Sequence, residues 1–490
     1  MTSLHYLSAT EALHLFRTRQ LSPVELMQAI VDRASIVEPV VNAFAEQMFE
    51  QALLAARAAE QRYRSGGEPG PLEGLPVAAK EEQHLAGFPV TDGTLLRPSY
   101  PAPQTALVLA RIQEAGGIVH ARTTTSEFCC LPMSHSRRWG VTRNPWNLET
   151  SVGGSSGGSA ASLAAATTTL ATGSDIGGSL RAPASFAGVV GYKPPHGRNP
   201  ILPPAGLDPY FHHGPMAKTV ADCALLQNVM AGEDPRDPDS HLASVAIPRD
   251  LEGVRGLTVA VSPAPGDFPV DPEIRANTEA VADALRSAGA VVAEIELGLQ
   301  LDMIKRALGA HFGSALGTEI LELDRLHPDV VTPYCLAFAR DGVKVGSMMD
   351  TASGRALEQA VRDQLDEVFS QFDALIIPTV GATAFAAGED YTETSLAVNG
   401  VALEHFSDAS LTPAFNISST HPVISVPSGW AHNNVPTGVQ VVAARYADVT
   451  AFRVASAIEQ TVGAGFITRT PQDENLRSTA AGSTPLRARS

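Results

Sequence analysis

The sequence predicts an α/β fold in which helices cover both faces of a β-sheet. Stretches with helical periodicity alternate with short apolar runs bounded by glycine and proline along most of the chain. Such alternation is typical of sheets with helices on both faces. The composition, with 44% hydrophobic and 18% charged residues among 490, is that of a globular protein with a sizeable core.

The N-terminal residues 1–70 are expected to form a helical segment that packs on the core. Apolar residues recur there at intervals of three and four. Two capping boxes mark helix starts, Ser8 with Glu11 and Ser22-Pro23 with Glu25.

The elements of the main domain, residues 71–470, begin at Leu75. The run Leu75–Ala79 predicts a strand, residues 105–115 a helix, and residues 116–119 the next strand. An Ala-rich stretch predicts a buried helix over 160–171. The later elements are expected in this order: strand 257–261, helix 272–287 with Asp271 as its cap, strand 290–295, strands 374–378, 423–427 and 438–442, and a helix near 450–460.

Two stretches differ from this alternation. Residues 300–370 are mostly helical, with aromatic side chains among charges, and are expected to form a variable insertion or lid. The polar residues 471–490 are expected to be a disordered tail. We find no internal repeat.

Charge and cysteine content exclude several classes of function. A net charge of −17 and an isoelectric point near 5.3, without a cluster of Lys and Arg, argue against nucleic-acid binding. Four scattered cysteines predict neither a disulfide framework nor a zinc site, which fits the reducing cytoplasm. We expect a soluble protein without a signal peptide or membrane span.

The glycine- and serine-rich run over residues 152–160 has three possible interpretations. It could be a flexible linker, although it leads directly into an apolar helix. It could cradle a phosphate, but no Gly-Lys-Ser/Thr follows. It could also carry the nucleophile of an α/β-hydrolase-type esterase, because Gly153-x-Ser155-x-Gly157 and the same pattern one residue later fit G-x-S-x-G. That motif needs a preceding strand, and residues 146–151 make a poor one.

A second unusual segment runs from Gly173 to Arg181 and contains Gly177-Gly178-Ser179. Glycines tolerate the backbone angles at which consecutive N–H groups converge, so this segment could hold a nucleophilic serine beside an oxyanion hole. A tight turn with an incidental serine is the alternative. A serine needs a base, and Lys80 ends an apolar run, where burial would favour its neutral form; a solvated lysine is again the alternative.

Together these segments resemble the amidase signature family. A strand ending in Lys, a Gly-Gly-Ser-Ser-Gly-Gly-Ser loop and Gly-Ser-Asp-x-Gly-Gly-Ser-x-Arg occur in the order seen in that family. Further similarity covers most of the chain except residues 300–400; it includes the runs 144–146, 188–194, 214–217, 422–427 and 438–440. The resemblance, which extends to bacterial amidases acting on oligoamides and urethanes, implies the amidase signature fold, a central mixed β-sheet covered by helices on both faces.

The resemblance also assigns roles to residues. It implies Ser179 as nucleophile, Ser155 as bridging serine after a cis peptide bond, and Lys80 as base. The backbone of Ile176, Gly177, Gly178 and Ser179 would form the oxyanion hole. The pocket-forming region of the family falls on Phe128, Cys129, Cys130, Leu131 and Met133.

The implied activity is that of a serine hydrolase cleaving amide bonds, and also esters and carbamates, of small, partly apolar substrates, without metal or organic cofactor. We expect a monomer or homodimer. The alternatives are the glutaminase subunit of a tRNA-dependent amidotransferase, whose stretch equivalent to residues 199–204 looks different, and a binding protein without catalysis. Here Glu81 and Glu82 follow Lys80, where the family usually has Asp and then often Asn. A carboxylate from Glu82 beside Lys80 would oppose its role as base, so activity should rise above pH 7.

Overall fold

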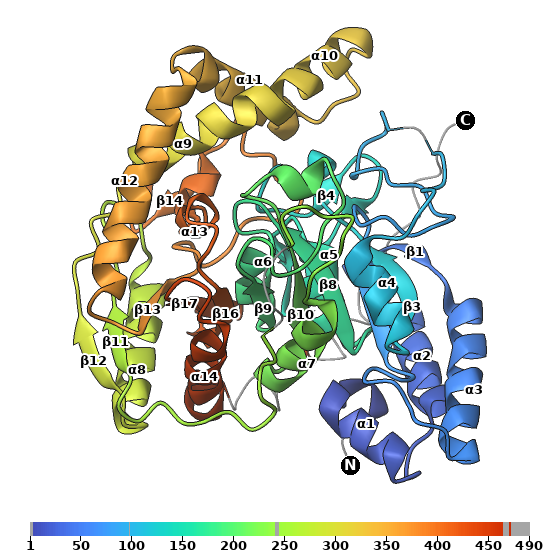
Figure 1. Ribbon diagram of the computed structural model, residues 1–490. Coiled ribbons are helices and arrows are strands. Elements are labelled where there is room, and N and C mark those ends of the chain that lie inside the picture. The colour runs from blue at the N-terminus through green and yellow to red at the C-terminus, as the bar shows by residue number, and fades with distance from the viewer. Residues whose placement is uncertain (1–2, 98, 241–244, 464–469, 472–490) are drawn as a thin grey trace.

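A large mixed β-sheet forms the centre of the computed structural model, which describes residues 3–97, 99–240, 245–463 and 470–471 (Figure 1). Within this part of the chain the sheet has eleven strands in the order β1-β3-β2-β8-β10-β9-β16-β17-β13-β11-β12. They are β1 (Phe44–Gln47), β2 (Pro76–Lys80), β3 (Ile118–Thr123), β8 (Leu170–Asp175), β9 (Val190–Lys193), β10 (His212–Ala217), β11 (Thr258–Val261), β12 (Val291–Glu294), β13 (Ala374–Pro378), β16 (Val423–Trp430) and β17 (Pro436–Ala443).

The sheet has a parallel part on each side of an antiparallel middle, and its edge strand β1 pairs antiparallel with β3. Strand β2 runs parallel to β3 and β8, and β11 runs parallel to β12 and β13. The pairs from β8 through β10, β9, β16 and β17 to β13 are antiparallel. Three two-stranded sheets lie outside it: β4 (His135–Ser136) with β5 (Gly140–Val141), β6 (Arg143–Asn144) with β7 (Asn147–Ser151), and β14 (Ala397–Val398) with β15 (Val401–Ala402).

Helices flank the sheet. The α-helices are α1 (Ala9–Arg17), α2 (Pro23–Val41), α3 (Phe49–Ser65), α4 (Leu107–Glu114), α5 (Gly157–Ala164), α6 (Arg181–Ala187), α7 (Val220–Met230), α8 (Pro272–Ser287), α9 (Leu301–Phe312), α10 (Thr318–Leu326), α11 (Pro333–Ser347), α12 (Thr351–Phe369), α13 (Ala414–Ile417) and α14 (Asp448–Ile458). Short 3₁₀ turns occupy Leu4–Tyr6, Glu127–Cys129, Ala205–Leu207 and Phe406–Ala409, and π turns occupy Gly313–Gly317 and Glu459–Gly463. No helix in the described ranges is long and apolar enough to cross a membrane.

Alternating side chains divide the core between the two faces of the sheet. In β2, Val77 and Ala79 pack with α1, α4, α7, α8 and α14, whereas Ala78 packs with α5 and α6 on the other face. In β13, Ile376 belongs to the first face and Leu375 packs with α9 and α12. Successive residues of a strand point to opposite faces, so helices on both sides bury every position of β2 and β13. The predicted fold class is therefore confirmed.

Most predicted elements are present, often to within one or two residues. Both capping boxes form, at the N-termini of α1 and α2. Asp271 caps α8, where its carboxylate accepts a hydrogen bond from the Glu273 amide at 2.9 Å. Residues 300–370 are helical, as predicted, and α9 to α12 stand at one edge of the molecule in Figure 1.

Three expectations were wrong. The N-terminal segment also contributes a strand, β1, which pairs with β3 at the edge of the sheet. The helix predicted over 160–171 already ends at Ala164, and Leu170 and Ala171 belong to β8. Residues 147–151 form the strand β7 despite their polar composition, because they pair with β6 outside the main sheet. Of the expected tail, residues 472–490 lie outside the described residues.

Candidate active site

Lys80 ends β2 in the interior of the protein, where its side chain is fully buried. Its Nζ donates hydrogen bonds to Ser155 Oγ at 2.8 Å and to Ser174 Oγ at 2.9 Å. The apolar run before Lys80 lies between β3 and β8, and this central position removes the amine from water. The lysine is therefore not the solvated side chain of the alternative interpretation.

The glycine- and serine-rich run holds Ser155 against Lys80. The Gly154–Ser155 peptide bond is cis, as the family resemblance implied. A Cβ atom on Gly154 would lie 1.9 Å from the carbonyl oxygen of Met133, so only glycine fits there. The run is buried and leads directly into α5, which excludes a flexible linker. The esterase interpretation fails too, because Ser155 and Ser156 are fully buried and β7 lies outside the main sheet.

The segment from Gly173 to Arg181 is braced by a buried ion pair. Arg181 contacts both carboxylate oxygens of Asp175, Nε to Oδ2 at 3.0 Å and Nη2 to Oδ1 at 2.8 Å. Burial alone would raise the pKa of Asp175, but the Arg181 guanidinium and the Asn416 amide hold it well below its ordinary value. Ser156 N also donates to Ser179 O at 3.2 Å, which joins the two loops. This brace fixes Ser179 relative to the sheet.

The expected oxyanion hole needs one correction. The Gly178 amide already donates to Asp175 Oδ1 at 2.8 Å, so it is not a free donor. The amides of Ile176, Gly177 and Ser179 have no acceptor among the described residues. Gly178 has φ +128°, and a Cβ there would lie 1.9 Å from Thr412 Oγ1. The positive φ explains why glycine is needed, and it turns the chain so that Ser179 reaches the cavity wall.

A cavity of about 600 Å³ lies above these loops. Ser179 lines it with Gly154, Ile176, Gly177 and Gly178. Helices α9 and α11 supply six of its apolar side chains, which are Leu301, Ile304, Leu308, Phe312, Phe338 and Val345. Lys305 joins this wall and makes ion pairs with Glu404 at 2.7 Å and Asp408 at 3.1 Å. A volume of this size accommodates a small organic molecule.

The expected pocket residues divide into two groups. Cys129, Cys130 and Leu131 line the cavity. Phe128 and Met133 do not; they are buried in the apolar cluster behind it, so their assignment to the cavity wall was wrong. Burial raises the pKa of the Cys129 thiol to about 12, so this cysteine stays protonated and is a poor nucleophile.

Glu82 and His213 form a second layer behind Lys80. Glu82 Oε2 lies 3.8 Å from His213 Nε2, and both side chains are nearly buried. Burial alone would raise the pKa of Glu82, but the His213 imidazole and the Lys80 ammonium hold it at about 2. The effect of Glu82 on Lys80 stays a prediction.

His213 and Asn416 were not predicted as parts of the site. They lie far from Lys80 and Ser179 in sequence, and no local motif marks them. The described part of the chain contains no group of three or more His, Cys, Asp or Glu placed to hold a metal ion.

The fold and this site define an enzyme, with a buried lysine–serine contact beneath a substrate-sized cavity. A family model described as Amidase matches residues 25–452, so the chain belongs to the amidase signature family and acts on carbon–nitrogen bonds.

Three similar proteins span almost the whole chain. The A subunit of the glutamyl-tRNA(Gln) amidotransferase of Carboxydothermus hydrogenoformans is 33% identical, and the match covers 93% of this chain and 97% of that protein. An acylamidase of Rhodococcus erythropolis is 31% identical, with coverage of 93% and 96%. The crystal structure of a bacterial aryl acylamidase of the amidase signature family has a TM-score of 0.86 at 26% identity, with coverage of 99% and 100%.

Proposed function

We propose that this chain is a stand-alone serine hydrolase that cleaves amide bonds of small, partly apolar molecules through an acyl-enzyme on Ser179. The observation that carries the proposal is the 2.8 Å hydrogen bond from Lys80 to Ser155, buried directly beneath a cavity whose wall contains Ser179. Cys129, which also lines the cavity, stays protonated and is a poor competitor for the role of nucleophile.

In the proposed reaction, Ser179 Oγ forms a bond to the substrate carbonyl carbon. Its proton passes to Ser155 Oγ, while the proton of Ser155 passes to the neutral amine of Lys80. The carbonyl oxygen becomes an oxyanion, and the free amides of Ile176, Gly177 and Ser179 are its donors.

The second half of the reaction reverses these proton transfers. The tetrahedral intermediate collapses, the carbon–nitrogen bond breaks, and the amine leaves with a proton returned through Ser155 from Lys80. Water then attacks the acyl-enzyme, with the same relay accepting its proton, and the acid and free Ser179 are released.

The cavity supports the proposed substrate class. Six apolar side chains on its wall from α9 and α11 favour aryl or alkyl groups, and the same wall also carries five charged side chains, Asp302, Lys305, Arg306, Asp341 and Lys344. Acyl-enzyme chemistry serves esters and carbamates, including urethanes, equally. The 31% identity to an acylamidase and the superposition on an aryl acylamidase support the same class.

The glutaminase subunit of a tRNA-dependent amidotransferase is the second candidate. The 33% identity to a protein of that kind favours it. In that case the chain would need partner subunits and would release ammonia from glutamine. The two candidates differ in whether the isolated chain catalyses hydrolysis and in which amide it hydrolyses.

The four cysteines are all free thiols, which supports the proposed cytoplasmic location.

Labelling with a fluorophosphonate tests the proposed nucleophile. The intact chain should be labelled at Ser179, and Ser179→Ala should lose both labelling and turnover, because no other hydroxyl in the cavity has this relay. Ser162→Ala is the matched control, since the hydroxyl of this buried serine in α5 donates to Ser159 O and the variant should label normally. Undiminished labelling of Ser179→Ala would refute the assignment; no labelling of the intact chain would favour a binding protein without catalysis.

A substrate panel tests the substrate class. The purified chain alone should hydrolyse aryl and alkyl amides with a higher kcat/KM than glutamine. Esters and carbamates complete the panel. Turnover of glutamine only, or only with a co-purified partner, would support the amidotransferase alternative instead.

A further inference from the structure

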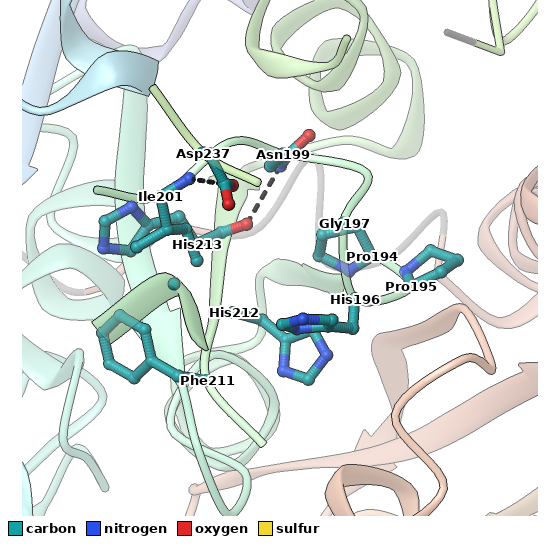
Figure 2. Close-up of a pocket in the computed structure, with 11 residues that line it drawn as sticks. Pro194, Pro195, His196, Gly197, Asn199, Ile201, Phe211, His212, His213 and Asp237 are labelled. Atoms are coloured by element: carbon teal, nitrogen blue, oxygen red, sulfur yellow. Dashed lines mark hydrogen bonds between the residues drawn. The ribbon is translucent and has the colours of Figure 1, made fainter. Parts of the chain in front are cut away.

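Of the cavities in the described part of the chain, the one above Ser179 is large enough for an organic substrate. The polar cavity beside His196, His212 and His213 measures about 10 Å³, which is room for about one water molecule (Figure 2). The cavity beside Lys218 measures about 60 Å³. The charged side chains in the wall of the large cavity are therefore the groups that can define the substrate further.

Lys305 on α9 is a cation in this wall, next to apolar side chains of the same helix such as Leu308. Its Nζ makes two ion pairs with the segment after β15, to Glu404 Oε2 at 2.7 Å and to Asp408 Oδ2 at 3.1 Å. Burial alone would lower the pKa of Lys305, but these carboxylates raise it above its ordinary value. The wall therefore combines an ammonium group with an apolar surface.

The two carboxylates that contact Lys305 are held very differently. The Asp408 side chain is 5% exposed, and its Oδ2 also accepts the His405 amide at 3.1 Å. The Glu404 side chain is 86% exposed, and Lys305 is its one ion-pair partner among the described residues. Exposed ion pairs contribute little to stability, whereas a nearly buried carboxylate needs its counter-charge. Glu404 can therefore leave Lys305 readily, and Asp408 stays.

The position that Glu404 occupies is suited to an anion at the opening of the cavity. Glu404 lines the cavity and is exposed, whereas Ser179 in the same wall is 8% exposed and lies deeper. Lys305 and, to a smaller degree, Lys344 and His405 lower the pKa of Glu404, and all of them line the cavity.

Exchange of groups at this position favours an anion over a cation. A substrate carboxylate would replace Glu404 at Lys305 without changing the charge of the site. A substrate ammonium group would instead have to separate Lys305 from the nearly buried Asp408, which costs more.

We propose that Lys305 binds a carboxylate of the substrate, so that the proposed substrate class narrows to partly apolar amides with a carboxylate at the end remote from the scissile bond. This inference rests on the proposed function. Glu404 occupies the position of that carboxylate in the structure. The apolar side chains of α9 and α11 contact the part of the substrate between the carboxylate and the amide at Ser179.

Matched pairs of anilides test this proposal. One set compares monoanilides of dicarboxylic acids of increasing length with the anilides of the matching fatty acids, so that a carboxylate replaces a methyl group on the acyl side. The other compares N-hexanoyl para-aminobenzoate with hexananilide, which places the carboxylate on the leaving group. The kcat/KM of the acid divided by that of its neutral partner should exceed one in at least one pair. In Lys305→Met this ratio should fall by about tenfold or more, because a hydrogen bond between two charged groups is lost.

Glu404→Gln is the second variant, and it removes the competing carboxylate without leaving a buried charge unpaired. The ratio should rise by about two- to fivefold, because the exposed ion pair no longer has to be broken. Arg306→Met is the matched control. Arg306 also lines the cavity but pairs with Asp302 on its own helix at 3.7 Å, so the ratio should stay within about twofold of that of the intact chain.

Three outcomes would overturn the inference. The first is a ratio at or below one in every pair with the intact chain. The second is a ratio that Lys305→Met leaves within about twofold, or that Arg306→Met lowers equally. The third is a fall of the ratio in Glu404→Gln, which would mean that the exposed carboxylate selects the substrate.

Glu404→Gln decides the question if Lys305→Met does not fold, because that change leaves Asp408 without its counter-charge. Failure of this inference leaves hydrolysis of the neutral anilides and fluorophosphonate labelling of Ser179 intact. Failure of the proposed function removes both.

Discussion

Asp175 organises the loop that carries Ser179. Its carboxylate accepts the amides of Gly178 at 2.8 Å and Leu180 at 3.1 Å in addition to the guanidinium of Arg181. A single side chain thus fixes the residues on both sides of Ser179. Because every acceptor position of Asp175 is used, the loop has one favoured conformation.

Loss of this carboxylate should destabilise the protein. Asp175→Asn leaves the fully buried Arg181 without its counter-charge, so we expect the free energy of unfolding at pH 7 to fall by about 3–5 kcal/mol, measured by urea denaturation. The exposed Asp283 on α8 is the control, and Asp283→Asn should change stability by less than about 0.5 kcal/mol. An equal loss of unfolding free energy in Asp175→Asn and Asp283→Asn would show that the buried ion pair of Asp175 with Arg181 does not stabilise the protein more than a surface contact does.

Among single residues, the sequence points to those that stand in a local motif and gives no sign of those that do not. Lys80, Ser155 and Ser179 stand in glycine-rich or strand-end contexts that can be recognised. His213 lies across from Ser174 because β8 and β10 pair in one particular register. The use of the Gly178 amide by Asp175 depends on loop geometry, which no spacing rule specifies.

Among the elements, buried strands and capped helices were the most predictable. The start of α8 is determined by Asp271 and Pro272, whose preferences are local. The end of α5 was misplaced because its Ala-rich sequence would continue a helix, whereas pairing of Leu170 and Ala171 with β2 draws these residues into the sheet. The polar strand β7 was missed because its pairing with β6, rather than burial of an apolar face, makes it a strand.

Helices α9 and α11 approach closely because of a pair of glycines. A Cβ on Gly313, directly after α9, would lie 2.0 Å from the carbonyl oxygen of Gly342 in α11. Their side chains form the apolar wall of the cavity. The distance between these two helices therefore determines the width of the proposed acyl or leaving-group site.

Gly313→Ala should push α9 and α11 apart. We expect a loss of stability of about 1–3 kcal/mol and a change in KM for bulky amides that exceeds the change for small ones. Thermal unfolding measures the loss of stability, and steady-state kinetics on amides of increasing size measure the change in KM. A Cβ atom on Gly298 would have no other atom within 4 Å, so Gly298→Ala should change neither the stability nor the KM values. A size series with uniform changes in KM would contradict the proposed wall.

One apolar cluster of the molecule brings together helices that lie far apart in sequence. The apolar cluster on one face of the sheet contains Phe16 of α1 and Ile458 of α14 together with strands from both halves. The N-terminal helices are therefore packed on the same core as the main domain.

Glu38 of α2 makes the stability of this assembly depend on pH. Burial raises its pKa to about 7, although its Oε2 accepts the amides of Ala43 and Phe44 at 2.9 Å each. A raised carboxyl pKa gives stability that is present below the ordinary value near 4.5 and is lost as the pH rises to about 7.

Glu38→Gln should reduce this dependence. Relative to the intact chain, the variant should gain as much as about 3 kcal/mol in free energy of unfolding between pH 4.5 and 8, because glutamine keeps an acceptor without ionising. Urea denaturation at several pH values measures the gain. The exposed Glu68 provides the comparison, and Glu68→Gln should follow the intact chain throughout; a parallel curve for Glu38→Gln would contradict the assignment.

The brace around Arg181 also has a consequence for biosynthesis. Its guanidinium donates to Thr412 O, Asn416 Oδ1 and Gln440 Oε1, at 2.8, 2.6 and 2.7 Å. A nascent chain released before these residues leave the ribosome already carries Lys80, Ser155 and Ser179, yet Arg181 has none of those acceptors. Fragments that end before Thr412 should therefore hold the nucleophile loop less firmly, so that full hydrolytic activity appears only once translation has passed Gln440.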